Sequence, residues 1–127
     1  MKSQILTTDL APQSPLYSQG VRAGQFLYVS GSTGMDVGAG AMAGPTIHEQ
    51  TAQAIRNCEA ILAAGGATLA DVVQVTVLLA RPDDFAGMNE AYALAFPADP
   101  PARAVARFGP EIDGVLVSVM MTAHIGD

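Results

Sequence analysis

The sequence predicts an α+β fold in which one mixed six-stranded sheet carries two helices on one face. This prediction rests on two segments with a helical spacing of apolar residues, on the β-branched segments that alternate with them, and on a closing pair of apolar strands. Segments in this order form one sheet against which both helices pack. A chain of 127 residues has the length of one domain, so we expect residues 1–127 to fold as a unit.

The composition and charge of the chain narrow its possible functions. Half of the residues are apolar and only 14% are charged, which is typical of globular proteins. The net charge is −6 and Lys2 is the only lysine, so the chain has no basic cluster for nucleic acid or for an anionic membrane. The single cysteine, Cys58, excludes an internal disulfide, and the N-terminal residues lack the apolar segment of a signal peptide. We therefore expect a cytoplasmic protein without nucleic-acid or membrane partners.

The N-terminal segments are predicted to be extended. Residues 20–24 (GVRAG) are typical of a hairpin turn between two short extended pieces. The aromatic and β-branched residues 25–31 (QFLYVSG) indicate a strand that ends at Ser30-Gly31. The Gly- and Ala-rich residues 35–45 indicate a loose hairpin or a surface loop.

The first helix has the clearest local signals. Thr46 and Glu49 match a capping box, in which the two residues satisfy each other's backbone N–H groups. Apolar or small residues then recur with helical spacing as far as Leu62, and Gly65-Gly66 ends the helix. Cys58 lies on this stripe, so we interpret it as a small core residue and not as a nucleophile.

The second half of the chain predicts three more strands and a second helix. Residues 72–80 are apolar on both faces, which favours a central strand. Pro82 ends that strand, and Asp83 or Asp84 is expected to cap a helix. The core stripe of this helix is predicted to consist of Phe85, Met88, Tyr92 and Phe96.

The prolines between residues 97 and 101 break the second helix, and residues 102–108 and 115–125 then form strands. In the last strand Met120 and Met121 point to opposite faces, so the face of the sheet without helices is also partly apolar. Such a face needs cover, and a cyclic oligomer is expected to supply it.

Most familiar catalytic arrangements are missing from the sequence. His48 and His124 are far apart and have only Cys58 as a possible soft co-ligand, so no metal-ligand spacing exists. Lys2 is a poor candidate for Schiff-base chemistry. The sequence also contains neither a phosphate-binding loop nor a G-x-S-x-G nucleophile motif.

Arg103 is the strongest candidate for a functional residue. It follows Pro100-Pro101 at the start of a predicted strand, and a rigidly held guanidinium offers two parallel hydrogen bonds to a carboxylate. From spacing alone, a structural salt bridge with one of the twelve acidic residues is the favoured alternative. Arg107 lies on the same face of a regular strand, and we interpret it as a rim or ion-pair residue.

Four segments together resemble the Rid family of reactive intermediate deaminases, also called the YjgF or RidA family. They are residues 11–21 (APQSPLYSQGV), 26–34 (FLYVSGSTG), 71–96 (DVVQVTVLLARPDDFAGMNEAYALAF) and 100–108 (PPARAVARF). The resemblance implies a fold like Bacillus chorismate mutase and a homotrimer with a central barrel, whose ligand sites lie in the clefts between subunits. It also implies hydrolysis of enamines and imines, such as 2-aminoacrylate and 2-iminopropanoate, to 2-keto acids and ammonia, with neither cofactor nor metal.

The resemblance assigns roles to individual residues. Arg103 matches the arginine that binds the substrate carboxylate, which reverses the preference for a salt bridge. Tyr17 matches a tyrosine that lines the site, Gly31 a glycine whose backbone contacts the ligand, and Asn89 an asparagine near the cleft. Val105 stands where many members have Cys or Ala, and we count it among the substrate-binding residues.

The last strand departs from the family pattern. Ser118 occupies the position at which deaminating members carry a glutamate, and Met120 occupies the next position on that face, which is often also acidic. A serine hydroxyl can orient a water molecule, but it is no general base at neutral pH. His124 lies on the same face and is too far along the strand to replace the glutamate.

Three functional hypotheses follow from these residues. The chain is a deaminase that uses Arg103 and Ser118; or it is a non-catalytic or altered-specificity trimer that binds small carboxylates; or it has the nuclease and translation-inhibitor activity ascribed to some relatives. The deaminase is the preferred hypothesis, the missing glutamate is the observation in favour of the second, and the acidity of the chain argues against the third.

Overall fold

The computed structural model describes residues 4–126, and it confirms the predicted α+β architecture. A six-stranded sheet runs in the order β1-β2-β3-β8-β6-β7, and a separate two-stranded hairpin contains β4 and β5. The strands are β1 (Gln4–Leu6), β2 (Gly20–Ala23), β3 (Phe26–Thr33), β4 (Met35–Asp36), β5 (Ala41–Met42), β6 (Val72–Leu79), β7 (Ala102–Arg107) and β8 (Val117–His124). The helices are α1 (Ile47–Ala64), α2 (Phe85–Ala95) and the short 3-10 turns Leu69–Asp71 and Pro82–Asp84. Lys2 lies outside the described residues.

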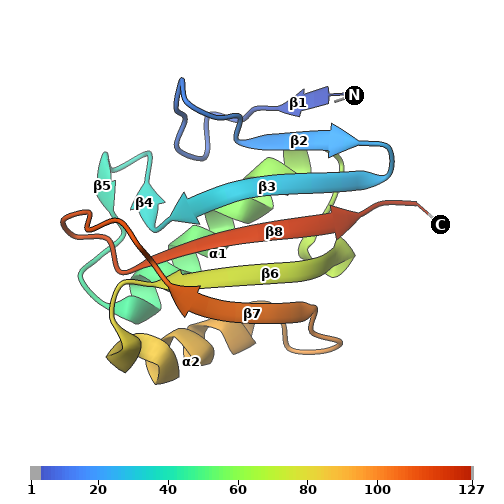
Figure 1. Cartoon of the computed structure of the whole chain (residues 1–127). Helices are drawn as coiled ribbons and strands as arrows, with labels where there is room; N and C mark the ends of the chain where they lie inside the picture. The colour runs from blue at the N-terminus through green and yellow to red at the C-terminus, as the bar shows by residue number, and fades with distance from the viewer. Residues whose placement is uncertain (1–3, 127) are drawn as a thin grey trace.

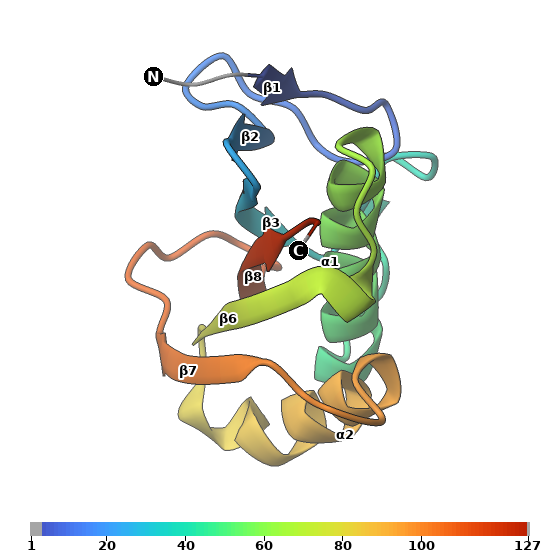
Figure 2. The same ribbon diagram turned by 90° about the vertical axis from the view of Figure 1, so that its right-hand side faces the viewer.

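Both helices cover the same face of the sheet (Figures 1 and 2). All neighbouring strands of the sheet are antiparallel except β6 and β7, which are parallel because α2 forms the crossover between them. β6 is an interior strand, as predicted, and β7 forms the edge of the sheet nearest α2 (Figure 1). The far edge is formed by β1.

The expected turn at residues 20–24 is wrong. Gly20–Ala23 is strand β2, and the chain reverses at Gly24-Gln25, where Gly24 has a φ of +61°. Gly20 is there for close packing, since a Cβ at this position would lie 2.7 Å from Cγ2 of Ile61. The next strand, β3, also extends beyond the predicted end at Ser30-Gly31, and its register with β8 shifts between Val29 and Ser32.

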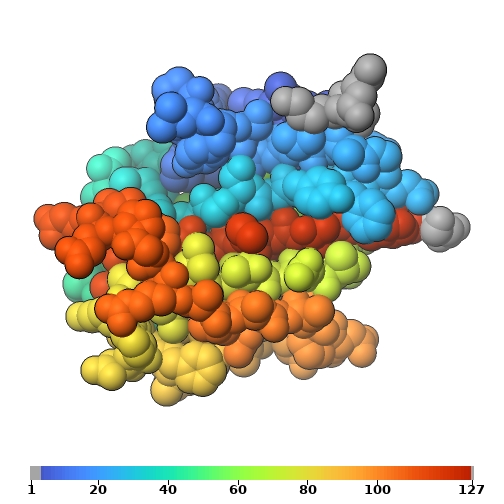
Figure 3. All heavy atoms as spheres, viewed as in Figure 1, coloured from blue at the N-terminus to red at the C-terminus, as the bar shows by residue number. Residues whose placement is uncertain are grey.

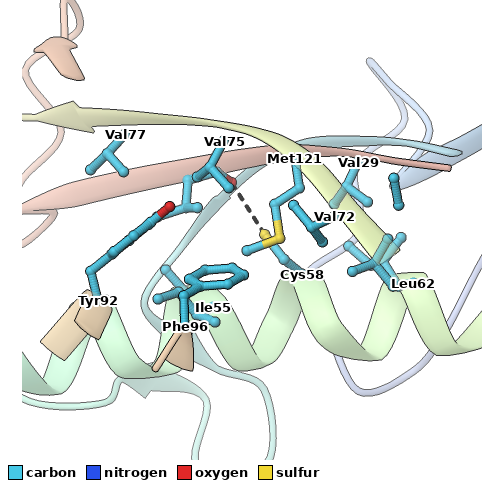
Figure 4. Close-up of a cluster of buried hydrophobic side chains, with 14 of the residues drawn as sticks. Val29, Ile55, Cys58, Leu62, Val72, Val75, Val77, Tyr92, Phe96 and Met121 are labelled. Carbon is cyan, nitrogen blue, oxygen red and sulfur yellow. Dashed lines mark hydrogen bonds between the residues drawn. The ribbon is translucent and has the colours of Figure 1, made fainter. Parts of the chain in front are cut away.

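Helix α1 begins and ends as predicted. Thr46 Oγ1 accepts a hydrogen bond from the Glu49 N–H at 3.2 Å, and Glu49 Oε1 accepts one from the Thr46 N–H at 3.4 Å. Cys58 is fully buried against the sheet, where its thiol donates to the Val119 carbonyl at 3.3 Å (Figure 4). Burial raises the pKa of this thiol to about 12, which confirms that it is a core residue and not a nucleophile at neutral pH.

Helix α2 differs from the prediction at its N-terminus. Asp84 occupies the N-cap position, as predicted, but its side chain makes no capping hydrogen bond; its carboxylate instead accepts a hydrogen bond from Arg81 Nε at 3.0 Å. Of the predicted core stripe, Met88, Tyr92 and Phe96 are buried, but Phe85 remains 47% exposed. The stripe therefore belongs to the core only from its second member onward.

The two faces of the sheet differ in cover. On β8 the side chains of Val117, Val119, Met121 and Ala123 are buried beneath the helices, whereas Met120 is exposed on the opposite face. Phe26 and Tyr28 of β3 are exposed on that same open face, which Figure 3 views directly. The prediction of a second, semi-apolar face without helices is thereby confirmed.

Candidate functional site

Arg103 extends from the edge strand β7 toward α2. It pairs in register with Val75 of β6, whose side chain is buried on the helix-covered face, so Arg103 projects to the same side. Its Nη1 donates a hydrogen bond to Asn89 Oδ1 at 2.7 Å, and its guanidinium carbon lies 4.8 Å from the centroid of the Tyr92 ring. The side chain nevertheless remains exposed, so further N–H donors face solvent.

The salt-bridge alternative for Arg103 is not observed. Within residues 4–126, the ion pairs join Arg81 with Asp84 and His48 with Glu90, and none involves Arg103. Its contacts are instead a neutral amide and an aromatic face, which orient the guanidinium and leave its charge uncompensated. Such a group has the chemistry required to bind a carboxylate.

Sequence reasoning assigned Tyr92 to the core and missed its contact with Arg103. Figure 4 shows the Tyr92 side chain reaching from α2 toward β6. Burial raises the pKa of its phenol above the usual value, and the positive charge of Arg103 partly offsets this effect. Its hydroxyl is buried and has no hydrogen-bond partner among the described residues. The available signal was helical spacing, because Asn89 and Tyr92 are three residues apart and share one face of α2.

Gly31 and Ser118 lie together on the open face of the sheet. A Cβ at Gly31 would lie 2.9 Å from the Ser118 Oγ, so any larger residue at position 31 would press on the hydroxyl. Thr33 pairs with Ser118 across β3 and β8 and lies on the same face. Ser118 is only 5% exposed, and the glycine beside it lets the backbone of β3 approach the hydroxyl closely.

Tyr17 is held beside Gly31 by a hydrogen-bonded loop between β1 and β2. Tyr17 and Gly31 line one small pocket, together with Ser30 and Thr33. The Ser30 hydroxyl donates to the Ser18 carbonyl at 2.6 Å, which ties the loop to β3. Half of the Tyr17 side chain is exposed, so its ring and hydroxyl remain available for contacts.

Gln19 fixes the shape of this loop, a role that sequence reasoning did not assign. Its Oε1 accepts from the Thr8 N–H at 2.7 Å, and its Nε2 donates to the carbonyls of Thr8, Ala11 and Pro12 at 3.0, 2.9 and 2.9 Å. A buried glutamine that satisfies four loop groups rigidifies the segment that carries Tyr17. The only feature of the sequence that could have indicated this role is the position of Gln19 in the SPLYSQG segment.

The chain brings its predicted site residues together in two groups and keeps the groups apart. Arg103, Asn89 and Val105 lie along β7 and α2, whereas Gly31 and Ser118 lie on β3 and β8, with Tyr17 beside Gly31 in the loop between β1 and β2. Only β6 lies between β8 and β7, so Ser118 and Arg103 are two strand spacings apart, about 10 Å in the plane of the sheet, and Gly31 on β3 is one spacing farther. The groups also lie on opposite faces of the sheet, so one chain alone does not close a site around both.

Acid and base groups are scarce near both groups. Within residues 4–126, no cluster of three His, Cys, Asp or Glu side chains has the arrangement of a metal site. His124 packs edge-on against Phe26, with ring centroids 5.0 Å apart, at the far end of β8 from Ser118. Six residues along a strand correspond to about 20 Å, so His124 does not reach Ser118. No helix among the described residues has the length and hydropathy needed to cross a bilayer.

The fold and these residues define a protein of the type described as endoribonuclease L-PSP, whose family model matches residues 8–125. A 2-iminobutanoate/2-iminopropanoate deaminase of Rattus norvegicus is 39% identical over 102 residues, which cover 80% of this chain and 74% of the relative. The chain belongs to the Rid family of reactive intermediate deaminases.

Solved structures of relatives support this assignment. The crystal structure of RidA from the Antarctic bacterium Psychrobacter sp. PAMC 21119 matches with a TM-score of 0.88 at 32% identity, over 96% of this chain and 99% of the other. Escherichia coli TdcF, crystallised with bound serine, matches with a TM-score of 0.89 at 26% identity, over 98% and 100% of the two chains. The family and its named relatives support a Rid-type imine or enamine deaminase activity.

Proposed function

We propose that this protein hydrolyses small 2-imino and 2-enamino acids to 2-keto acids and ammonia, with the substrate carboxylate bound by Arg103. The observation that carries the proposal is the environment of Arg103. Its guanidinium is oriented by Asn89 and Tyr92, remains exposed, and has no carboxylate partner within residues 4–126. A planar guanidinium held in this orientation matches a carboxylate in charge and in geometry.

The complete site is proposed to form between subunits of a homotrimer. Arg103 and Ser118 lie on opposite faces of one sheet and two strands apart, so a second copy must supply the missing group of residues. The open face of the sheet, with exposed Phe26, Tyr28 and Met120, is the surface through which the copies would pack. Mass measurement in solution tests this assembly, and a monomer at working concentration would contradict it.

The reaction needs one water molecule and no cofactor. An enamine first tautomerises to the imine: C3 takes a proton from water, and the nitrogen releases one to water as the C=N bond forms. Water then adds to C2 while the imine nitrogen gains a proton, which gives a carbinolamine. The C2–N bond breaks as the new C2 hydroxyl loses its proton, and the products are the 2-keto acid and ammonia. Arg103 holds the carboxylate throughout, and Tyr17 together with the backbone at Gly31 orients the reacting carbon.

Ser118 limits how the site assists proton transfer. Its hydroxyl can orient the attacking water but cannot accept a proton at neutral pH, so protons are exchanged with water and with the substrate nitrogen. Such a site accelerates the reaction mainly by binding and positioning. The same observation favours a second candidate, a trimer that binds small carboxylates without turnover, and the bound serine of the relative TdcF is consistent with ligands of this size.

The first experiment compares the hydrolysis of 2-iminopropanoate by the wild type, Arg103→Ala and Arg56→Ala. Arg56 is a matched control, because it is an exposed arginine on α1 whose guanidinium donates a hydrogen bond to Gln53 at 3.0 Å. We expect the wild type and Arg56→Ala to exceed the spontaneous rate and Arg103→Ala to lose about 100-fold or more in kcat/KM. If the wild type does not accelerate the hydrolysis but still binds pyruvate, the deaminase proposal is wrong and the trimer that binds small carboxylates takes its place.

Nuclease activity, which the family description names, has little support in this chain. A net charge of −6, with only six Lys and Arg residues in the chain, disfavours binding to a phosphate backbone. RNA cleavage that survives rigorous purification and persists in Arg103→Ala would contradict this view.

A further inference from the structure

Helix α1 carries a buried glutamine whose amide joins three segments of the chain. Gln50 is only 2% exposed. Its Nε2 donates to the Gly44 carbonyl at 3.0 Å and to the Gly114 carbonyl at 2.8 Å, and its Oε1 accepts from the Leu116 N–H at 2.9 Å. All three partners lie outside the strands and helices, so this side chain satisfies backbone groups that regular structure leaves without partners.

Asn57 does the same for the end of β3. It is fully buried, and its Nδ2 donates to the carbonyls of Thr33 and Met35, each at 2.9 Å. Gln50 and Asn57 are two helical turns apart, so they lie on one face of α1. The segment after β3 packs so closely on this face that a Cβ at Gly34 would lie 2.7 Å from the Cα of Gln50. Helix α1 thus holds the end of β3 and the segment before β8 through two neutral amides.

The segments held by α1 lead directly to Ser118. This serine follows Leu116 by two residues, and it pairs with Thr33, the last residue of β3. The pairing of β3 with β8 is irregular beside this pair, because the register shifts between residues 29 and 32, the interval that contains Gly31. Regular strand pairing therefore does not extend through Gly31, and the hydrogen bonds from α1 hold the two strands where the ladder ends.

We propose that Gln50 is a positioning residue for the hydrolysis, because its amide fixes the segment that enters β8 and thereby places the Ser118 hydroxyl beside Gly31. The inference rests on the proposed function, in which Ser118 orients the attacking water. The hydrogen bonds of Gln50 all go to backbone groups, so it acts through the main chain and not on the substrate. A displacement of about 1 Å at a reacting group can lower a rate by about 100-fold, so a remote amide can control the chemical step.

This role predicts an effect on kcat and not on KM. The substrate carboxylate is proposed to bind Arg103 on β7, and Arg103 is oriented by Asn89 and Tyr92 of α2. None of the hydrogen bonds of Gln50 involves β7 or α2. Loss of the Gln50 amide should therefore leave carboxylate binding unchanged and slow only the step in which water attacks.

The experiment is a double-mutant cycle of Gln50→Met and Ser118→Ala, with kcat and KM measured for 2-iminopropanoate. Methionine has nearly the length of glutamine but cannot replace its three hydrogen bonds. We expect Gln50→Met alone to lower kcat by about tenfold, with KM within about twofold. In the Ser118→Ala background the same substitution should cost less than about threefold, because the group that Gln50 positions is already absent. Equal losses in both backgrounds would overturn the inference, since Gln50 would then act on the fold as a whole.

Leu62→Ala is the control for a loss of stability. Leu62 is fully buried on the same helix, and it lies 12 residues after Gln50, which is about 18 Å along the helix axis. Its truncation destabilises the core, but the kcat of the folded protein should stay within about twofold. An equal loss of kcat in Leu62→Ala would attribute the effect of Gln50→Met to stability and overturn the inference.

Two further provisions make the outcome decisive. Circular dichroism checks that each variant is folded at the assay temperature, and Gln50→Asn, which keeps an amide but displaces it, takes the place of Gln50→Met if the latter does not fold. A wild type that does not accelerate the hydrolysis contradicts the proposed function and this inference together. An active wild type whose kcat is unchanged by the substitution at Gln50 contradicts this inference alone.

Discussion

The two groups of candidate site residues differ in what their surroundings prepare them to do. Arg103 is charged and exposed, and it is oriented by the Asn89 amide, 14 residues away in sequence, and by the Tyr92 ring. Ser118 is neutral, nearly buried, and packed against the backbone at Gly31. The Arg103 group can bind an anion. The Ser118 group can shape the site and orient a water molecule, but Ser118 provides no carboxylate to act as a general acid or base.

This difference shows that substrate recognition and proton transfer are separable in this chain. In a site where both depend on charged groups, loss of either one abolishes activity and the two contributions are hard to tell apart. Here the charge is concentrated on the β7 side, so substitutions on that side should change binding first. Substitutions on the β8 side should change the chemical step, and the two effects can be measured independently.

The largest effect is expected for Arg103→Lys. Lysine keeps the positive charge but cannot bind a carboxylate through two parallel hydrogen bonds or stack with its plane on Tyr92. We expect kcat/KM for 2-iminopropanoate to fall by about 100-fold, mostly through KM. Arg56→Lys is the control, and a near-normal KM in Arg103→Lys would show that charge alone suffices.

The second-largest effect on activity is expected for Ser118→Glu, which adds a carboxylate to the Ser118 group. The Ser118 Oγ lies beside Gly31, which has no side chain to obstruct a longer residue at position 118. A general base contributes about 10²-fold or more when well placed, so we expect kcat to rise by at least about tenfold and to fall at acidic pH as the carboxylate is protonated. Ser118→Gln has nearly the same shape without the ionisable group. An equal gain in Ser118→Gln would attribute the effect to packing.

A smaller effect on activity, with a clear effect on stability, is expected for Gln19→Ala. The side chain makes four hydrogen bonds to the loop that carries Tyr17. Their loss should lower the free energy of unfolding by about 2 kcal/mol, because buried backbone groups are left without partners. Denaturant unfolding tests this against Gln13→Ala, whose exposed amide makes two longer bonds, of 3.2 and 3.4 Å, and should cost under about 0.5 kcal/mol. Equal losses in the two variants would mean that Gln19 does not fix the loop.

The sequence predicted those parts of the fold that depend on neighbouring residues. The start of α1 follows from Thr46 and Glu49, which are close in sequence and complete the capping box by themselves. Strand β2 was missed because Gly20 suggests a turn locally. The glycine is required at this position because Ile61 of α1 approaches too closely for a side chain. Contacts between distant segments leave no local pattern, so glycines chosen for packing and glycines chosen for turns look alike in a sequence.

The candidate site shows the same limit. The position of Arg103 on a strand was predictable from the prolines before it and from the strand pattern. Its partners were not, because Asn89 and Tyr92 meet it only through the crossover that places α2 beside β7. In the same way, the exposure of Phe85 depends on where the edge strand ends, and the helical stripe alone assigned it to the core.

The smallest effect is expected for Tyr92→Phe, and it tests whether the aromatic face or the hydroxyl supports Arg103. Phenylalanine keeps a ring beneath the guanidinium, so kcat/KM should stay within about twofold, whereas Tyr92→Leu removes the ring and should cost about threefold or more. The hydroxyl is buried without a partner among the described residues, so its removal should leave the stability at pH 7 unchanged or raise it by up to about 1 kcal/mol.

The pH dependence of stability makes this last comparison sharper. The phenol pKa of Tyr92 is raised in the folded protein above the usual 10.0, mainly by burial, so folding favours the protonated form. That contribution is complete below pH 10 and is lost as the pH rises through the folded pKa, because the unfolded chain ionises first. Tyr92→Phe has no such group and should lose less stability than the wild type between pH 9 and pH 11, as measured by thermal unfolding at about one-unit intervals. Parallel losses in the two proteins would place the alkaline sensitivity at groups other than Tyr92.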